Sequence, residues 1–196
     1  MREAETVTRA ERDGYTLLLS SAGEVAVNPH LFKSIKYDPS RDLTPVSLVV
    51  KVPNVLVVNA ASDIKSLDNL SNAGNNKDAK ATFSSSGIGN PQHLAGELLN
   101  RMASTNLMHV PYRGAAQQVT DVLGNNVTAT FASYLAVAPF VEADQVRALG
   151  VTASERVPSL PSVPAMAEHP QLKGYDVTSW FGLFGRPVHR PRSSTS

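Results

Sequence analysis

The segment Thr82–Glu97 constrains the fold most, because it combines a buried strand, a Ser/Gly loop and a helix in direct succession. Asn90 is a favoured N-cap residue and Pro91 suits the first helical position, after which Leu94 and Leu98 recur on one face. Free N–H groups at such a helix start, beside serines and glycines, suit an oxyanion. The loop holds no acid–base pair and no set of metal ligands. The segment therefore predicts a place that binds a carboxylate without transforming it.

Regular alternation of strands and helices extends from Ala81 to Thr152 and predicts parallel βαβ units in an α/β fold. Ligands of open parallel sheets collect outside the carboxyl ends of the strands. The loops after Leu19, Phe83 and Phe131 are therefore expected to be walls of one pocket. The apolar runs predict strands at 15–19, 46–50, 54–58, 81–83, 109–112, 127–131, 147–152 and 174–184.

Composition excludes several classes of function. The chain of 196 residues is 42% hydrophobic and 18% charged, which is typical of a folded protein. A net charge of +1 gives no broad basic field for nucleic acid, and the absence of Cys excludes disulfides and thiolate metal sites. No two His residues stand at i, i+4 spacing, and Gln92 replaces the third Gly of a dinucleotide fingerprint. We therefore expect no metal and no cofactor.

Together, many short stretches resemble the Bug family, the solute-binding receptors of tripartite tricarboxylate transporters. The order and spacing of these stretches agree from about Asp13 to Phe184. The matching stretches are Asp13–Leu18, Asn28–Phe32, Tyr37–Val46, Pro53–Asn59, Ser85–Gly87, His93–Glu97, His109–Gly114, Leu160–Pro164 and Thr178–Phe184.

The resemblance implies an α/β fold of the periplasmic-binding-protein type, with two α/β domains and parallel-rich sheets. Residues 1–52 with 179–196 would form an incomplete first domain, and residues 53–178 the second, with hinges near 51–53 and 178–180. It also implies a non-catalytic receptor in the periplasm, which captures a small carboxylate and passes it to the membrane permease of the transporter. The chain as written carries no export signal.

The candidate ligand-binding residues come from three loops. Two of the candidates could instead have a purely structural role. The Ser85 loop could be a solvated turn that caps a helix, and His93 could be a first-turn histidine bonded to backbone or water. By position in the family, the candidates are Ser20, Ser21, Ala22 and Gly23, then Ser85, Ser86, Gly87, Gly89 and His93, and finally Ser133.

Three departures from the family pattern limit what the resemblance implies. The opening β–α–β unit is absent, and after Phe184 the chain continues into a basic, Pro- and Ser-rich segment, so the chain is expected to be truncated at both ends. Many members carry Asp-Asn where this chain has Ala132-Ser133, which favours a plain carboxylate over an amino acid. Truncation predicts weak carboxylate binding or none, and self-association through exposed sheet edges.

Two other functions stay open at this point. A degenerate remnant would bind little or no ligand. A hydrolase or lyase would use Ser86 and His93, although no Gly-x-Ser-x-Gly elbow is present and only Glu97 is near enough in sequence to orient the histidine. We expect the protein not to be an enzyme.

Overall fold

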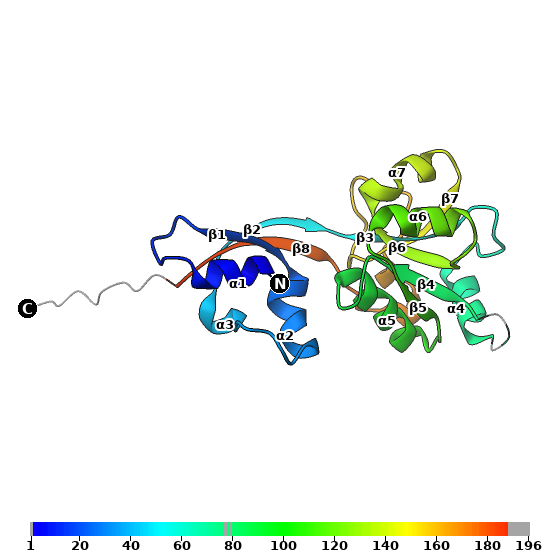
Figure 1. Ribbon diagram of the computed structural model, residues 1–196. Coiled ribbons are helices and arrows are strands. Elements are labelled where there is room, and N and C mark those ends of the chain that lie inside the picture. The colour runs from blue at the N-terminus through cyan, green and yellow to red at the C-terminus, as the bar shows by residue number, and fades with distance from the viewer. Residues whose placement is uncertain (1, 77, 79, 188–196) are drawn as a thin grey trace, which may run out of the picture. The chain divides into compact units, whose positions relative to one another are not determined.

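The computed structural model describes residues 2–76, 78 and 80–187, and it divides the chain into two compact units (Figure 1). Unit 1 takes the residues up to Lys51 and those from Trp180 onward, and unit 2 is Val52–Ser179. The strands are β1 (Leu17–Ser21), β2 (Thr44–Val52), β3 (Asn54–Asn59), β4 (Thr82–Ser85), β5 (Met108–Pro111), β6 (Ala129–Ser133), β7 (Val146–Val151) and β8 (Ser179–Gly185). The helices are α1 (Arg2–Arg9), α2 (Asn28–Leu31), α3 (Pro39–Asp42), α4 (Leu67–Asn75), α5 (Pro91–Ala103), α6 (Ala115–Leu123) and α7 (Tyr134–Glu142), with a π-helical turn η1 (Gly23–Val27) and 3-10 turns η2 (Met166–Glu168) and η3 (Pro170–Leu172).

Unit 1 is a three-stranded sheet with helices against one face. The strand order is β1-β8-β2, and β1 pairs antiparallel with β8, so that Leu18 lies opposite Phe184. Figure 1 shows α1, α2 and α3 on the same side of this sheet. Ala4 and Val7 of α1 are buried there with Leu18, which forms the small core of the unit.

Unit 2 is a five-stranded sheet covered on both faces, with α4 and α5 on one side and α6 and α7 on the other (Figure 1). Every residue of β3 is buried: Leu56 and Val58 face the α5 side, and Val55 and Val57 face the α6 side. Such a strand reads as a continuous apolar run because neither face meets water.

The topology of unit 2 contains the predicted parallel strands, together with one strand, β3, whose place in the sheet and antiparallel direction the pattern did not predict. The order is β5-β4-β6-β3-β7, with β4 parallel to β5 and to β6. β3 is inserted between β6 and β7 and is antiparallel to both, so β7 runs in the same direction as β6. The sheet is therefore mixed, although the four strands of the alternating region share one direction.

The structure confirms the predicted starts of the two helices that a side chain was expected to cap, α4 and α5. Asn90 accepts a hydrogen bond from the N–H of His93, and Ser66 accepts one from the N–H of Asn69. The predicted buried face of α5 is wrong by one residue: Ala95, Leu99 and Ala103 are buried, whereas Leu94 and Leu98 are only half-buried. The helix is rotated so that Ala95, Gly96, Leu99 and Ala103 are buried.

The first and sixth strands begin two residues later than predicted. β1 starts at Leu17, and Tyr15 is 91% exposed; β6 starts at Ala129. The Pro-rich stretch 154–164 forms no helix or strand, as its prolines predict. In the part of the chain that the structure describes, no helix has the length and apolar character needed to cross a membrane.

Gly96 allows α5 to approach β4 closely, and this generates a stability prediction. A Cβ at Gly96 would lie 2.0 Å from Cε2 of the fully buried Phe83. Gly to Ala inside a helix ordinarily stabilises by about 0.5–1 kcal/mol. Here we expect Gly96→Ala to lower the free energy of unfolding by about 1–3 kcal/mol, because overpacking outweighs helix propensity. Urea unfolding followed by circular dichroism measures the change.

The control uses the ring that causes the clash. In a Phe83→Leu background, the same Gly96→Ala change should cost clearly less, because the ring edge that the new methyl group meets is gone. Stabilisation by Gly96→Ala in the wild-type background would contradict the close packing of α5 on β4.

His109 on β5 generates a prediction about pH. Its ring stacks on Phe83 with 4.9 Å between centroids, and burial, followed by the nearby His93, lowers the pKa of His109 to about 4. Between pH 6.5 and 4 the unfolded chain therefore takes up a proton at this site that the folded chain does not. We expect the stability that a neutral His109 provides to be complete above pH 6.5 and to fall as the pH drops towards 4.

The measurement is the slope of unfolding free energy against pH in this range. His109→Gln should reduce the slope, expressed as protons taken up on unfolding, by up to one proton, whereas Gln117→Asn, an exposed change that involves no ionisable group, should leave it unchanged. Equal slopes for wild type and His109→Gln would show that His109 titrates normally in the folded chain.

Candidate functional site

Polar side chains meet at one edge of the unit 2 sheet. β4 and β6 are parallel and end at Ser85 and Ser133, and the antiparallel β3 begins at Asn54, directly opposite Ser133. The loop 86–90 leaves this edge and enters α5 at Pro91. Of the sequence-predicted site residues, the structure therefore brings Ser85, Ser86, Gly87, Gly89, His93 and Ser133 to one edge of unit 2.

Three amide groups of this loop already have partners, which corrects part of the expectation drawn from the helix start. The N–H of Ser86 donates to Gln92 Oε1 at 2.8 Å, and the N–H of Gly89 donates to His93 Nδ1 at 3.1 Å. The N–H of Gly87 donates to Ser85 Oγ at 3.2 Å. Side chains of the loop and of the first turn of α5 thus occupy three of the donors that were expected to face a ligand.

The hydroxyl of Ser86 remains a donor. Asn90 Nδ2 donates to Ser86 Oγ at 2.8 Å, while Asn90 Oδ1 caps α5. Among the hydrogen bonds of the described residues, the Ser86 hydroxyl only accepts, so its own proton stays available. Ser86 and Gly87 are half-buried, and φ of Gly87 is +145°, a conformation that side chains rarely adopt.

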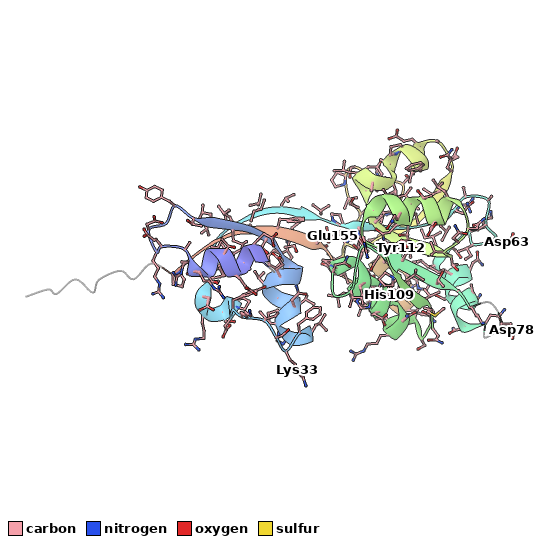
Figure 2. All side chains as sticks on the ribbon, viewed as in Figure 1. Lys33, Asp63, Asp78, His109, Tyr112 and Glu155 are labelled. Carbon is pink, nitrogen blue, oxygen red and sulfur yellow. The ribbon has the colours of Figure 1, made fainter. Side chains whose placement is uncertain are left out.

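Ser85 has a structural position. It is fully buried, its hydroxyl donates to the carbonyl oxygen of Gly87 at 2.9 Å, and its Oγ lies 2.7 Å from His109 Nε2 (Figure 2, where His109 is labelled). Because the Ser85 proton goes to Gly87, the hydrogen of the second bond belongs to Nε2 of His109. Ser85 therefore fixes the loop, and its hydroxyl proton is already used by Gly87.

His93 forms the outer part of a histidine pair. Its ring stacks on that of His109 with 4.1 Å between centroids, and its Nδ1 accepts from Gly89. Nε2 therefore carries the hydrogen of the neutral ring and lies 3.6 Å from Glu97 Oε1. The alternative of a first-turn histidine bonded to backbone describes its present contacts.

Gln92 and Asn54 are the residues that sequence reasoning missed. Gln92 is buried, and its Nε2 donates to Asn54 Oδ1 at 3.3 Å while its Oε1 accepts from Ser86. Asn54 Nδ2 donates to Ser179 Oγ at 3.0 Å, and its N–H donates to Thr152 Oγ1 at 2.9 Å. The two amides connect the loop to the start of β3, to Thr152 directly after β7 and to Ser179. Because 38 residues separate Asn54 from Gln92, no local sequence pattern indicates that these two side chains are hydrogen-bonded.

The unit 1 candidates have different surroundings. Ser20 is buried and its hydroxyl donates to Glu24 Oε2 at 2.5 Å. Ser21 is half-buried at the end of β1, and Ala22 precedes η1, whose first residue is the buried Gly23. Their contribution to a ligand site stays a prediction.

The arrangement does not assemble a serine nucleophile. Ser86 Oγ is bonded to Asn90 and His93 Nδ1 to the N–H of Gly89, so these two residues do not pair with each other. The Ser85–His109 contact joins a buried hydroxyl to a ring with a pKa of about 4, which is a weak base at neutral pH. Among the described residues, no group of three His, Cys, Asp or Glu side chains is placed to hold a metal ion.

Comparison with known proteins gives the family. The profile of the tripartite tricarboxylate transporter family receptor, TctC, matches residues 2–192. The chain is 38% identical over 190 residues to the UPF0065 protein in the tcbD-tcbE intergenic region of Pseudomonas sp. (strain P51), which covers 97% of this chain and 56% of that protein. The chain thus spans little more than half the length of this relative.

Two solved structures are similar to this chain over nearly all of its length. Rpa4515 from R. palustris, solved with adipate, has a TM-score of 0.82 and 31% identity, covering 96% of this chain and 62% of that one. MatC (Rpa3494) from Rhodopseudomonas palustris, solved with bound malate, has a TM-score of 0.77 and 27% identity, covering 97% and 64%. The α/β fold of periplasmic binding proteins, expected from the sequence, is confirmed. The chain belongs to the tripartite tricarboxylate transporter receptor family, TctC, a family of non-enzymatic solute-binding receptors.

Proposed function

We propose that this chain serves as a receptor for a small carboxylate, bound at the sheet edge where β4 and β6 end. The similar structures that hold adipate and malate, two dicarboxylates, support this ligand class. The local geometry adds support, because carboxylate oxygens need donors, and serine hydroxyls stand directly after β4, at Ser86, and at the end of β6, at Ser133.

The observation that carries the proposal is the bond from Asn90 to Ser86. It orients the Ser86 hydroxyl as an acceptor towards the helix cap and so leaves its proton for an incoming carboxylate. Gly87 follows without a Cβ, and the nearest atom to a Cβ built there is 3.9 Å away, so the backbone beside Ser86 stays open to approach. Ser133, whose hydroxyl makes no capping bond to α7, supplies a second donor in the proposal.

Gln92 acts in this proposal as a positioning residue. The side-chain oxygen of Gln92 accepts a hydrogen bond from the Ser86 N–H, and the Gln92 side chain is itself held by Asn54. The position of the Ser86 backbone, and with it the direction of the Ser86 hydroxyl, therefore depends on the buried side-chain amide of Gln92 and not on solvent. Hydrogen bonds in such a place are strengthened by the low local dielectric. His93, which holds Gly89, supports the other end of the loop.

The ligand class follows from what the edge lacks. Ala132 and Ser133 supply no carboxylate for a ligand amino group, which favours a plain acid over an amino acid.

We also propose periplasmic action and delivery to a membrane permease, on the strength of the family resemblance. Ser21, Ala22 and Gly23 in unit 1 are proposed as further ligand contacts, and Ser20 only as a support, because its hydroxyl is bonded to Glu24.

The test is isothermal titration calorimetry of the full chain with adipate and with malate. We expect binding by the wild type, and Ser86→Ala should weaken it by about 1.5–3 kcal/mol, the worth of a hydrogen bond to a charged group. The change removes one half-buried hydroxyl and leaves the capping bond of Asn90 to His93 in place, so the fold should survive.

Ser159→Ala is the matched control, since Ser159 is exposed in the Pro-rich stretch far from the loop in sequence, and it should bind as the wild type does. No detectable heat with either acid at millimolar concentration would favour the remnant that binds little or nothing. Equal affinities for Ser86→Ala and wild type would remove Ser86 from the site.

A further inference from the structure

The two ends of the loop 86–90 are held by different kinds of acceptor. The amides of Ser86 and Gly87 donate to a side-chain amide oxygen and to a serine hydroxyl, and neither of these acceptors titrates near neutral pH. The amide of Gly89 donates instead to Nδ1 of His93, at 3.1 Å. Histidine is the side chain whose charge ordinarily changes between about pH 5 and 8. The Gly89 end of the loop therefore depends on the protonation state of one ring.

The bond from Gly89 exists only while His93 Nδ1 keeps its lone pair. A backbone N–H can only donate, so Nδ1 is the acceptor and the neutral ring carries its hydrogen on Nε2. A proton added to this ring goes to Nδ1, because Nε2 already holds one, and both nitrogens of the histidine cation are donors. Two donors would then face each other. Protonation of His93 therefore breaks this bond and frees the Gly89 N–H.

In the described part of the chain, two titratable groups contact the His93 ring. Glu97 on α5 has its Oε1 3.6 Å from Nε2, and His109 on β5 stacks on the ring with 4.1 Å between centroids. Phe83 on β4, which stacks at 6.5 Å, and Gly89 carry no charge. Burial, followed by the nearby His93, lowers the pKa of His109 to about 4, so His109 stays neutral above about pH 5. A proton taken up by the stacked pair above this pH therefore belongs to His93, whose side chain is 20% exposed to solvent.

We propose that His93 is a proton-sensitive latch of the loop: a proton at Nδ1 releases the Gly89 N–H, and the freed amide beside an imidazolium strengthens carboxylate binding. The second half rests on the function proposed above. Ser86 keeps its orientation in both states, because its N–H is bonded to Gln92 and its hydroxyl to Asn90. The protonated loop thus offers a carboxylate one more N–H donor and a positive charge. By linkage, carboxylate binding then takes up a proton.

The first experiment follows the ligand-free full chain by NMR from about pH 8 to about pH 5. The ¹⁵N shifts of the His93 ring report its tautomer and its protonation, and the amide shifts report the loop. We expect the Nε2–H tautomer at the alkaline end. The Gly89 amide should then shift with the same midpoint as the His93 ring, while the Ser86 amide, whose acceptor does not titrate, shifts much less.

His93→Asn keeps a side-chain acceptor near the position of Nδ1 but cannot take up a proton, so it should remove the titration of the Gly89 amide. His169→Asn is the matched control, because His169 contacts Asp68 on α4 and not the loop, and it should leave that titration in place. A His93 ring that stays neutral down to about pH 5, or a Gly89 amide that does not follow the ring in the wild type, overturns the latch.

The second experiment measures adipate binding by calorimetry at about pH 8 and about pH 6, in buffers of different ionisation enthalpy. The wild type should gain at least about fivefold more affinity at the lower pH than His93→Asn does, with net proton uptake. Titration of adipate itself affects both chains equally. Binding with the same pH dependence in both chains overturns the coupling and leaves the proposed function standing. Absence of binding at either pH counts against the proposed function and the coupling, and the ligand-free titration still decides the latch.

Discussion

The candidate site depends on the two hydrogen bonds made by the side-chain amide of Gln92. A primary amide offers one acceptor and two donors, and Gln92 uses the acceptor for the Ser86 N–H and a donor for Asn54 Oδ1. The group is buried, so losing either bond would leave an unsatisfied polar atom. The loop after β4 and the start of β3 are thereby fixed relative to each other, although 38 residues separate Asn54 from Gln92.

This constraint changes how the loop is understood. A helix start with serines and glycines is expected to present amides to an anion. Here Gln92, His93 and Ser85 bind the amides of Ser86, Gly89 and Gly87 and so shape the loop, while the Ser86 hydroxyl keeps its proton available. Recognition would then depend on the directions of Ser86 and Ser133 more than on the helix dipole, and a hydroxyl that Asn90 holds in place is already oriented before a ligand arrives.

The sequence allowed the local features to be predicted, because they depend on neighbours along the chain. Asn90 and Pro91 predicted the start of α5, and the apolar run at 54–58 predicted a buried strand. Features set by distant residues escaped prediction. β3 lies between β6 and β7, where helices cover both faces of the sheet and bury all its apolar side chains. The apolar run of β3 alone does not indicate which strands are its neighbours or that it runs antiparallel to them. His109 looked like an ordinary strand residue until Phe83 and His93 were seen to pack against it.

Titration of the uniformly ¹⁵N-labelled full chain with malate, followed by amide chemical shifts, tests the central claim most directly. The account predicts that the largest shifts occur at Ser86, Gly87 and Ile88, with a second group near Ser133, and that the amides of α4 stay unchanged. Shifts confined to residues outside the carboxyl edge of β4 and β6, or no shift at saturating malate, would contradict it.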